Sequence, residues 1–428
     1  MQTLRVITLG CSKNTVDTSH LLYKLRNSYE ILPEEYEGPV DVLLINTCGF
    51  IGDAKQQSID TILEAVAGGQ AGRILVFGCL SQRYMAELPE LIPEVDGWFG
   101  ARDMEPLLKA LGCTSRPEDE TGRVIYDGHH PYAFLKISEG CDRRCSYCAI
   151  PLIRGTHKSV PEEKLLEEAR GLAAEGVKEL VVIAQDTTFY GLDLYGKRTL
   201  AHLLRSLSEV EGISRIRLHY SYPQGFPEDV LDEMASNPKI CPYIDIPLQH
   251  ISDKVLEAMH RGVNGEQTRA LVRKFREKVP GVVLRTTMIV GHPGEGEAEF
   301  EELLRFVEEA RFERLGAFTY SEEEGTFGAE NLSDDVPEDV KRERLSRLMA
   351  LQEKISLEYN RSRVGSVEKV LVDDLADGVF VCRSAAESPE VDGEVLVKSV
   401  PGISVGDFID VRVTGCDSYD LIAEPLEI

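Results

Sequence analysis

Apolar runs and amphipathic segments alternate three times in the first 112 residues. The apolar runs "LRVITLGC" (4–11), "VDVLLINTCGF" (40–50) and "GRILVFGCL" (72–80) each precede a helical pattern, at 12–25, 51–66 and 81–91. A short apolar run followed by an amphipathic helix is typical of a βα unit, and successive units build a parallel sheet. We therefore expect an N-terminal parallel α/β domain over residues 1–115.

A second series of the same kind covers residues 132–362. Amphipathic helix patterns separate six strand candidates, at 132–138, 178–186, 215–221, 243–249, 282–290 and 314–321. Six βα units in one series predict a partial (β/α)6 barrel, a fold that places its site at the C-terminal ends of the strands. A polar, turn-rich stretch at 116–131 is expected to link this barrel to the N-terminal domain.

The pattern changes again in residues 363–428. Short alternating strands are expected at 366–374, 378–384, 393–399 and 407–416, with glycine-containing turns between them. This pattern predicts a small antiparallel β-barrel. The whole chain is therefore expected to be an α/β multidomain protein with three folded parts and one linker.

Charge and hydropathy narrow the classes of function. The 428 residues carry a formal net charge of −26, which argues against binding nucleic acid mainly through its phosphates. A basic protein partner fits this charge better, although excess carboxylate can also serve solubility alone. No apolar run is long enough to span a membrane, and the first residues resemble a buried strand rather than a signal peptide. A cytoplasmic protein is therefore expected.

Cysteines are the main chemical signal, since ten are present. In a reducing compartment, metal binding or catalysis explains them better than disulfides. Cys11, Cys48 and Cys79 each stand where a predicted strand ends and a helix begins. The carboxyl ends of parallel strands share one edge of a sheet, so the three thiols could converge there. The alternative is that they are small buried apolar residues, as free cysteines often are.

Three further cysteines, Cys141, Cys145 and Cys148, follow the first strand of the central series with the spacing C-x3-C-x2-C. Three thiolates can hold three irons of a cubane iron–sulfur cluster and leave the fourth iron open to a small molecule. A catalytic zinc ion also keeps three protein ligands, but histidine commonly supports it and C-x2-C pairs are its usual signature. The spacing therefore favours a cluster over zinc.

This triplet, with Tyr147 just before its last cysteine and a (β/α)6 series around it, resembles the radical SAM superfamily. The resemblance implies a 4Fe–4S cluster on the three cysteines, with S-adenosylmethionine bound to its open iron. Reductive cleavage of that cofactor then gives methionine and a 5′-deoxyadenosyl radical, so the cofactor supplies the hard chemistry and the barrel positions it. A flavodoxin or ferredoxin would suit as the electron donor.

Polar residues at the ends of predicted strands are candidates for the S-adenosylmethionine pocket. They are Gln185, Asp186, Ser221 and Gln249, and their place at the C-terminal ends of barrel strands is the argument for them. Ordinary hydrogen bonding at strand ends is an equal alternative. Arg285 could pair with the carboxylate of the cofactor, or it could form a structural ion pair.

Nearly the full chain resembles the methylthiotransferases, which combine an N-terminal three-cysteine domain, a radical SAM barrel and a small C-terminal β-barrel named TRAM. The stretches "LGCSKNTVD", "INTCGF" and "GCLSQRY" carry the N-terminal part of the resemblance. It implies a second 4Fe–4S cluster on Cys11, Cys48 and Cys79. It also implies two uses of S-adenosylmethionine, one as a methyl donor to a sulfur at this second cluster and one as the radical source.

Within this family, "NTCGFIGDAKQQSIDTILEA" and "LKISEGCDRRCSYCAIPLIRG" resemble the branch that adds a methylthio group to the β-carbon of an aspartate in small ribosomal subunit protein S-twelve. Sister enzymes modify an adenosine of transfer RNA. From Gly365 to Ile428 the chain has 14 Asp and Glu against 4 Lys and Arg, which would repel phosphates and attract a basic ribosomal protein. A transfer-RNA methylthiotransferase and a non-enzymatic iron–sulfur protein that docks on the ribosome are the two alternatives.

Overall fold

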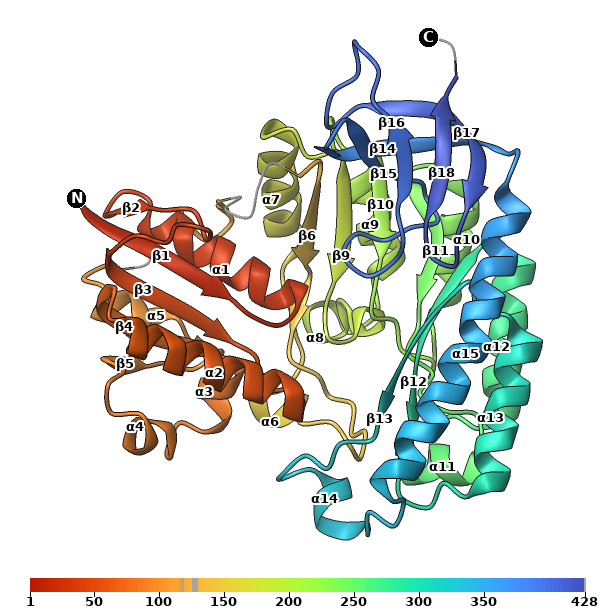
Figure 1. The fold of residues 1–428 in the computed structure, drawn as a ribbon, viewed down its shortest axis with the longest axis horizontal. Coiled ribbons are helices and arrows are strands. Elements are labelled where there is room, and N and C mark those ends of the chain that lie inside the picture. Colours follow the sequence, from red (N-terminus) through yellow and green to blue (C-terminus); the bar gives the residue numbers. More distant parts are fainter. Residues whose placement is uncertain (115, 117–118, 125–129, 427–428) are drawn as a thin grey trace.

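The chain folds into three parts in the computed structural model, which describes residues 1–114, 116, 119–124 and 130–426. Figure 1 shows an N-terminal domain in red to orange beside a central sheet in yellow to teal, with a blue barrel over one end of that sheet. The expected α/β multidomain architecture is confirmed. Part of the predicted linker lies outside the described residues, and the domain boundaries at 115, 131 and 362 stay predictions.

The N-terminal domain is a five-stranded sheet in the order β2-β1-β3-β4-β5, with every pairing parallel. Its strands are β1 (Gln2–Thr8), β2 (Tyr29–Ile31), β3 (Val40–Thr47), β4 (Ala71–Gly78) and β5 (Gly97–Trp98). Its helices are α1 (Ser12–Leu25), α2 (Gly52–Gly68), α3 (Cys79–Arg83), α4 (Leu88–Leu91) and α5 (Glu105–Ala110). The three expected βα units are present. The edge strands β2 and β5 were not predicted, because two or three residues are too few to show a period.

Strand β3 lies at the centre of this sheet and is buried on both faces. Val42 and Leu44 pack in one core with Leu22 of α1, whereas Leu43 and Ile45 belong to the core on the opposite face. Alternate residues of a strand point to opposite faces, and a parallel sheet covered on both sides needs apolar residues at both sets of positions. This requirement explains the unbroken apolar run of β3.

The central domain is a six-stranded parallel sheet in the order β13-β12-β11-β10-β9-β6, which confirms the six predicted strands. The strands are β6 (Tyr132–Lys136), β9 (Glu179–Ile183), β10 (Arg215–Leu218), β11 (Ile240–Asp245), β12 (Val283–Val290) and β13 (Arg314–Thr319). A short antiparallel pair, β7 (Ser138–Glu139) and β8 (Lys158–Ser159), follows β6.

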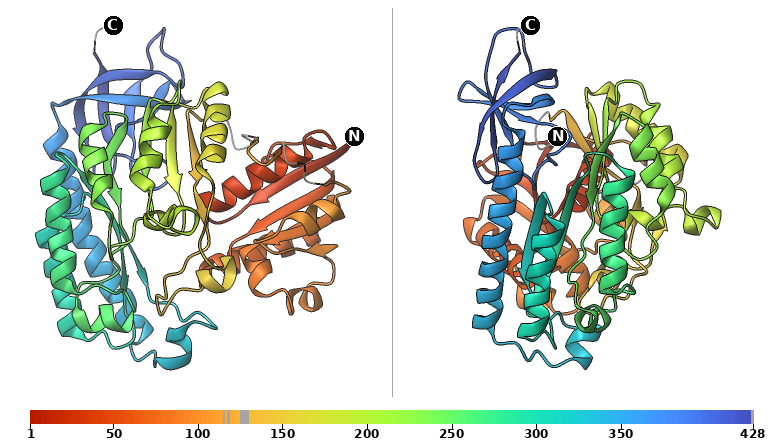
Figure 2. Two further views of the ribbon diagram at one scale, coloured as in Figure 1. Left: turned by 180° about the vertical axis from the view of Figure 1, so that it is seen from behind. Right: turned by 90° about the vertical axis from the view of Figure 1, so that its right-hand side faces the viewer.

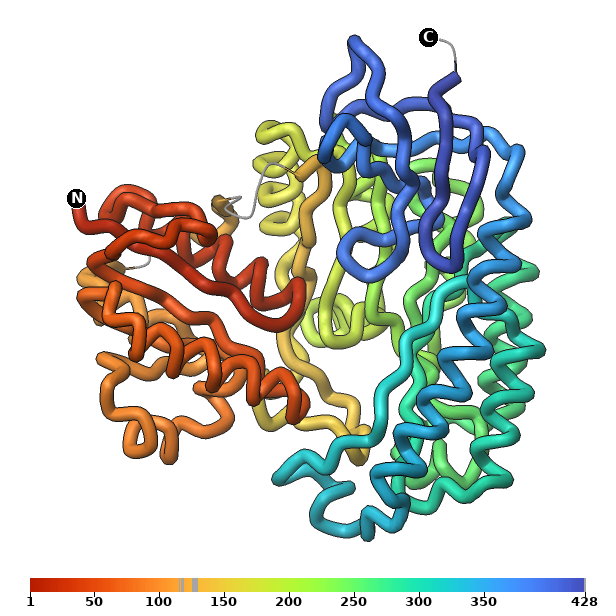
Figure 3. Tube along the Cα trace, in the orientation of Figure 1, coloured from red at the N-terminus to blue at the C-terminus, as the bar shows by residue number. Residues whose placement is uncertain are grey.

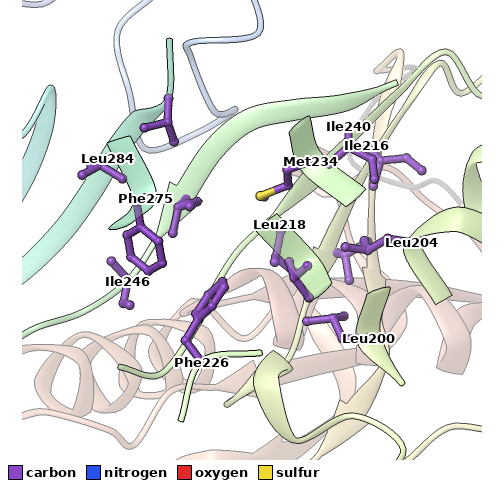
Figure 4. Close-up of a cluster of buried hydrophobic side chains, with 14 of the residues drawn as sticks. Leu200, Leu204, Ile216, Leu218, Phe226, Met234, Ile240, Ile246, Phe275 and Leu284 are labelled. Carbon is purple, nitrogen blue, oxygen red and sulfur yellow. The ribbon is translucent and has the colours of Figure 1, made fainter. Parts of the chain in front are cut away.

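Helices connect these strands and cover one face of the sheet. They are α6 (Ile150–Arg154), α7 (Glu162–Ala174), the 3-10 helix η2 (Thr187–Phe189), α8 (Leu192–Tyr195), α9 (Leu200–Ser208), α10 (Glu228–Ser236), α11 (Asp253–Ala258), α12 (Gly265–Lys278), α13 (Glu297–Ala310), α14 (Phe327–Asn331) and α15 (Glu338–Arg363). Figure 4 shows part of the large core beneath them, where Leu200 and Leu204 of α9 lie beside Leu218 of β10. On the other face of the sheet, Val181 packs with Val16 of α1, so the N-terminal domain covers the part of that face formed by β6 and β9. Ala385 and Ala386 of the C-terminal part pack with Tyr243 and Val283.

The C-terminal part is a closed five-stranded barrel in the order β14-β15-β16-β18-β17. Its strands are β14 (Val367–Ala376), β15 (Val379–Arg383), β16 (Val395–Lys398), β17 (Phe408–Cys416) and β18 (Leu421–Pro425). It is antiparallel except for the parallel pair β16–β18. The fifth strand, β18, was not predicted, and it is the strand that closes the barrel.

Helix α15 runs along the edge strand β13 and leads into the barrel, as the two views of Figure 2 show. The barrel sits where the central strands begin. Arg215, the first residue of β10, donates to the carbonyl oxygen of Arg383 in the barrel. The trace in Figure 3 shows the barrel returning close to the start of β6, where the hydroxyl of Tyr132 contacts Glu390 at 3.3 Å. Cys141, Cys145 and Cys148 lie at the opposite end of the sheet, where the strands end.

Candidate active site

The N-terminal cysteine triplet stands at one edge of its sheet. Cys11 precedes the first turn of α1, Cys48 follows β3, and Cys79 is the first residue of α3 directly after β4. Because β1, β3 and β4 are neighbours, their C-terminal ends lie side by side. Cys11 and Cys48 both act electrostatically on the thiol of Cys79. The structure therefore brings these three cysteines together, as their strand positions predict.

Two glycines permit this close approach. Gly10 has a φ of +99°, and a Cβ there would lie 2.9 Å from the Cβ and 3.1 Å from the Sγ of Cys48. A Cβ on Gly49 would lie 2.7 Å from the backbone of Leu80. Any larger residue at either position would push the cysteine loops apart, and at Gly10 the left-handed backbone adds strain.

The thiols of this triplet form no disulfide. Burial raises the pKa of Cys48, and it raises the pKa of Cys79 to about 11 although Arg154 opposes the shift. Among the described residues, no three His, Cys, Asp or Glu side chains are gathered so as to hold a metal ion. In a cubane cluster each cysteine binds a different iron, so a cluster does not need the spacing of ligands around one ion. A donor set made only of thiols suits such a cluster.

The central triplet lies just beyond the C-terminal end of β6. The N–H of Cys141 donates to the carbonyl oxygen of Gly155 at 3.0 Å, and the N–H of Cys148 donates to that of Cys145 at 3.1 Å. Burial raises the pKa of Cys141 to about 12 and also raises the pKa of Cys148, with Cys145 adding to both shifts. The three thiols therefore interact electrostatically, and backbone hydrogen bonds maintain the shape of the loop that carries them.

Side chains from the segments that follow other strands of the sheet contact this loop. Arg261 donates through Nη1 to the Sγ of Cys145 at 3.3 Å and to the hydroxyl of Tyr147 at 3.2 Å. The hydroxyl of Tyr222 lies 3.5 Å from the same sulfur. His292, in the glycine-rich turn after β12, contacts the loop with Nε2 at 3.4 Å from the Oγ of Ser146.

Three of the expected pocket residues carry buried oxygen atoms with no hydrogen-bond partner among the described residues. These atoms are Oε1 of Gln185, Oγ of Ser221 and Oε1 of Gln249. Gln249 also has a φ of +74°, and such strain in a residue other than glycine is common at ligand sites. Unpaired buried polar atoms are costly, so this edge of the sheet suits a polar ligand such as S-adenosylmethionine.

The fourth expected residue, Asp186, is already engaged. It accepts a hydrogen bond from Arg143 Nε at 2.8 Å, and it also accepts from the N–H and the hydroxyl of Thr188 at 2.9 and 2.6 Å. Hydrogen bonding at the strand end, the alternative left open by the sequence, therefore describes Asp186. Through Arg143, which lies in the cysteine loop, this carboxylate also fixes the loop to β9.

Arg285 forms ion pairs in the structure. Its Nη1 donates to Asp245 at 2.8 Å, and its Nε lies 3.8 Å from Asp392 of the C-terminal barrel. Arg285 also lines a pocket with residues of α15 and the barrel. The reason is its place near the start of β12 rather than at its C-terminal end. These contacts are those of the ion-pair alternative, and a contact with the cofactor carboxylate stays a prediction.

The segment that follows the central triplet packs against the N-terminal triplet. Ala149, the residue after Cys148, and Ile153 form a buried cluster with Cys79. From the end of α6, Arg154 donates to the Sγ of Cys79 through Nε at 3.3 Å and Nη2 at 3.2 Å. A cysteine of the N-terminal triplet is thus in buried contact with the segment that directly follows the central triplet.

Charged residues of both domains support this contact, and the cysteine spacing gave no sign of them. Arg154 also donates to Asp17 of α1 at 2.6 Å and to Glu139 of β7 at 3.2 Å. Lys136 pairs with the same two carboxylates, and Gln185 Nε2 donates to Glu139 at 2.5 Å. The density of arginines in and after the triplet, in "CDRRCSYCAIPLIRG", is the one signal that could have drawn attention to Arg154.

Sequence identity to curated relatives shows to which family the chain belongs. A ribosomal protein uS12 methylthiotransferase RimO from Porphyromonas gingivalis is 50% identical over 424 residues, covering 98% of each chain. The protein of the same name from Christiangramia forsetii is 49% identical over 99% of this chain and 94% of its own length. The chain belongs to the RimO family of ribosomal protein uS12 methylthiotransferases. A third member, from Bacteroides fragilis, is 47% identical over 99% of both chains.

The parts of the chain match the parts expected of this RimO family. Residues 135–307 match the radical SAM superfamily, residues 364–426 match the TRAM domain, and residues 3–100 match a family described as uncharacterized protein family UPF0004. The expected resemblances to the radical SAM superfamily and to a TRAM barrel are confirmed. No helix in the described part of the chain is both long and apolar enough to cross a membrane.

Solved structures share the fold at low sequence identity. The radical S-adenosylmethionine methyltransferase TsrM from Kitasatospora setae gives a TM-score of 0.54 at 14% identity, over 95% of this chain and 84% of that chain. The cobalamin-dependent S-adenosylmethionine radical enzyme OxsB gives 0.51 at 16% identity, over 83% of this chain and 56% of that chain. These likenesses concern the fold alone.

Proposed function

We propose that this chain adds a methylthio group to the β-carbon of an aspartate in ribosomal protein uS12, with S-adenosylmethionine and two 4Fe–4S clusters as cofactors. The observation that carries the proposal is the buried contact of Cys79 with Ala149 and Ile153, which directly follow the central triplet. A reaction that removes hydrogen at one centre and delivers a sulfur group from another needs both centres next to one substrate carbon. Membership of the RimO family supports the same reaction.

In this proposal each triplet holds one cluster, and the protein contributes position rather than acid–base chemistry. A cluster with bound S-adenosylmethionine supplies hydrogen abstraction from an unactivated carbon, which no acidic or basic side chain can perform. The unpaired oxygens of Gln185, Ser221 and Gln249 are suited to hold the polar groups of the cofactor. Arg261 and Arg154 each donate to one cysteine sulfur and orient it. A flavodoxin or ferredoxin is the proposed source of electrons.

The charge of the C-terminal barrel supports a basic protein substrate over RNA. Residues 365–428 carry 14 Asp and Glu and 4 Lys and Arg, an excess of ten negative charges. A pocket between β6 and the barrel is lined by five carboxylates, which are Asp373, Asp374, Glu390, Asp392 and Glu394. Such a surface repels phosphates and attracts lysine- and arginine-rich segments.

An anaerobic assay tests the function. The reconstituted protein receives S-adenosylmethionine and a reductant together with either a peptide from the target loop of uS12 or unmodified transfer RNA, and mass spectrometry follows the methylthio group. We expect modification of the peptide alone. Modification of RNA alone would transfer the activity to the other branch of the family. Absence of 5′-deoxyadenosine would point to a non-enzymatic role in ribosome docking.

A further inference from the structure

Lys13 is a buried lysine at the boundary between the first two domains. It is the second residue of α1, two positions after Cys11, and only 8% of it is exposed. Its ammonium group reaches into the central domain, where Nζ lies 2.9 Å from the centre of the Tyr220 ring. A side chain of the N-terminal domain thus presents a positive charge at the end of β10.

Other buried cations in this region have carboxylate partners. Lys136 and Arg154 share Asp17 and Glu139, and Arg285 has Asp245. For Lys13, within the part of the chain that the structure describes, there is no ion pair and no hydrogen bond from Nζ. Its ammonium group lies over the face of the Tyr220 ring instead. A cation over an aromatic face recovers only part of the cost of removing an ammonium ion from water. The buried ammonium group of Lys13 therefore lacks a negatively charged partner among the described residues.

Groups close to Lys13 do not supply that charge. Asp245, which accepts a hydrogen bond from the N–H of Tyr220 at 3.0 Å, is already neutralised by Arg285. His219, the residue before Tyr220, is buried, and burial lowers its pKa to about 3, so it stays neutral. Ser221, the residue after Tyr220, has an unpaired Oγ but carries no charge. The arrangement suits a small anionic ligand.

We propose that Lys13 binds the side-chain carboxylate of the aspartate that is to be modified, an inference that rests on the function proposed above. Lys13 follows Cys11 by two residues, and the next residue, Asn14, has its Oδ1 3.8 Å from the Sγ of Cys79. Tyr220 precedes Ser221 of the expected cofactor pocket. The β-carbon of an aspartate is bonded directly to its carboxylate carbon. Anchoring the carboxylate at Lys13 therefore holds the β-carbon between the two cysteine centres.

This assignment also gives Lys13 a role in specificity. An adenosine has no carboxylate, and an asparagine side chain has the same shape as aspartate but no charge. A buried site built for an anion rejects a neutral analogue, because the ammonium group is then left without its partner. The acidic barrel would attract the basic segment, and Lys13 would select the residue within it.

A binding experiment separates this inference from the function itself. The cluster-loaded protein is titrated with a fluorescent uS12 loop peptide that carries either the target aspartate or asparagine in its place. We expect the wild type to prefer the aspartate peptide by about 10- to 100-fold, the usual value of a buried hydrogen bond to a charged group. Lys13→Met, which keeps the length of the side chain, should bring this ratio close to one by weakening the aspartate peptide alone.

Three controls complete the test. Lys24→Met removes a charge near the other end of α1 and should leave the ratio unchanged, whereas Lys13→Arg should restore most of it. Lys13→Gln serves if the methionine variant does not fold, and the iron–sulfur absorbance must match the wild type in each. Equal binding of the two peptides by the wild type, or an unchanged ratio in Lys13→Met, would overturn the inference. A ratio that depends on Lys13 without methylthio transfer would uphold Lys13 as a carboxylate-binding residue and refute the proposed function.

Discussion

The guanidinium group of Arg154 lies on the thiol of Cys79, with Nε and Nη2 at 3.3 and 3.2 Å from the sulfur. Arg154 ends the short helix after the central triplet, whereas Cys79 belongs to the N-terminal triplet 75 positions earlier. The same guanidinium pairs with Asp17 and Glu139. One side chain therefore joins a cysteine of one centre, a carboxylate of the N-terminal domain and a carboxylate of the central domain. The contacts that hold the two domains together therefore also fix the position of the two cysteine triplets relative to each other.

Replacement of Arg154 by glutamine should destabilise the docked domains. Loss of the guanidinium leaves Asp17 and Glu139 to share the one positive charge of Lys136, and removing one partner from a buried ion network typically costs about 3–5 kcal/mol. Urea unfolding of the cluster-free protein measures the change in the free energy of unfolding. Arg170→Gln, on the exposed side of α7, is the matched control and should cost under about 0.5 kcal/mol. Equal effects of the two substitutions would show that the Arg154 network does not hold the domains together.

Gly10→Ala should damage the N-terminal centre and spare the central one. The added Cβ meets Cys48 at 2.9 Å on a backbone with φ of +99°, so the loops that carry Cys11 and Cys48 must separate. Iron analysis after reconstitution should fall from about eight to about four irons per chain if each triplet holds one four-iron cluster. Reductive cleavage of S-adenosylmethionine should persist while methylthio transfer is lost.

The control for this prediction is Gly68→Ala. Gly68 ends α2, its φ is not left-handed, and a Cβ there meets nothing within 4 Å. This variant should keep the full iron content. If Gly10→Ala also kept all of its iron, the close approach of Gly10 to Cys48 would not be a requirement of the site.

Periodicity and cysteine placement were enough to predict the architecture and the two triplets, because both are local features. An apolar run followed by an amphipathic segment defines each βα unit, and the end of a strand fixes the edge at which Cys11, Cys48 and Cys79 appear. Strand β18 was missed because alternation over Leu421–Pro425 is weak next to a turn. The ion-pair partners of Arg285, Asp245 and Asp392, were not predicted, because a strand candidate does not reveal at which height of the sheet a residue lies.

The contacts between domains could not be predicted in this way. The network of Arg154 with Asp17 and Glu139, and the position of Lys13 over Tyr220, join residues whose separation in sequence carries no period. A lysine after Cys11 looks like one more solvated charge until the fold places the central sheet against α1. Only the tertiary structure distinguishes such a residue from the many exposed lysines.

Glu179 fixes the C-terminal barrel to the central sheet. It is the first residue of β9 and is fully buried. Its Oε1 accepts from Arg217 Nε at 2.8 Å, and its Oε2 accepts from Arg383 Nη1 of the barrel at 3.1 Å. Burial alone would raise the pKa of this carboxyl, but Arg383, Arg217 and Arg215 outweigh burial and lower the pKa from 4.5 to about 2.

The lowered pKa predicts how acid weakens the docked barrel. Glu179 binds a proton more readily in the unfolded chain than in the folded one, so its stabilising contribution is complete above pH 4.5 and is lost as the pH falls toward 2. A shift of this size corresponds to about 3 kcal/mol. Urea unfolding between pH 6 and pH 3 should therefore show a steeper loss of stability for the wild type than for Glu179→Gln, which is less stable at neutral pH but lacks this titration. Glu266→Gln, at an exposed position on α12, should follow the wild-type curve. Parallel curves for the wild type and Glu179→Gln would mean that the arginine cluster does not set the charge state of Glu179.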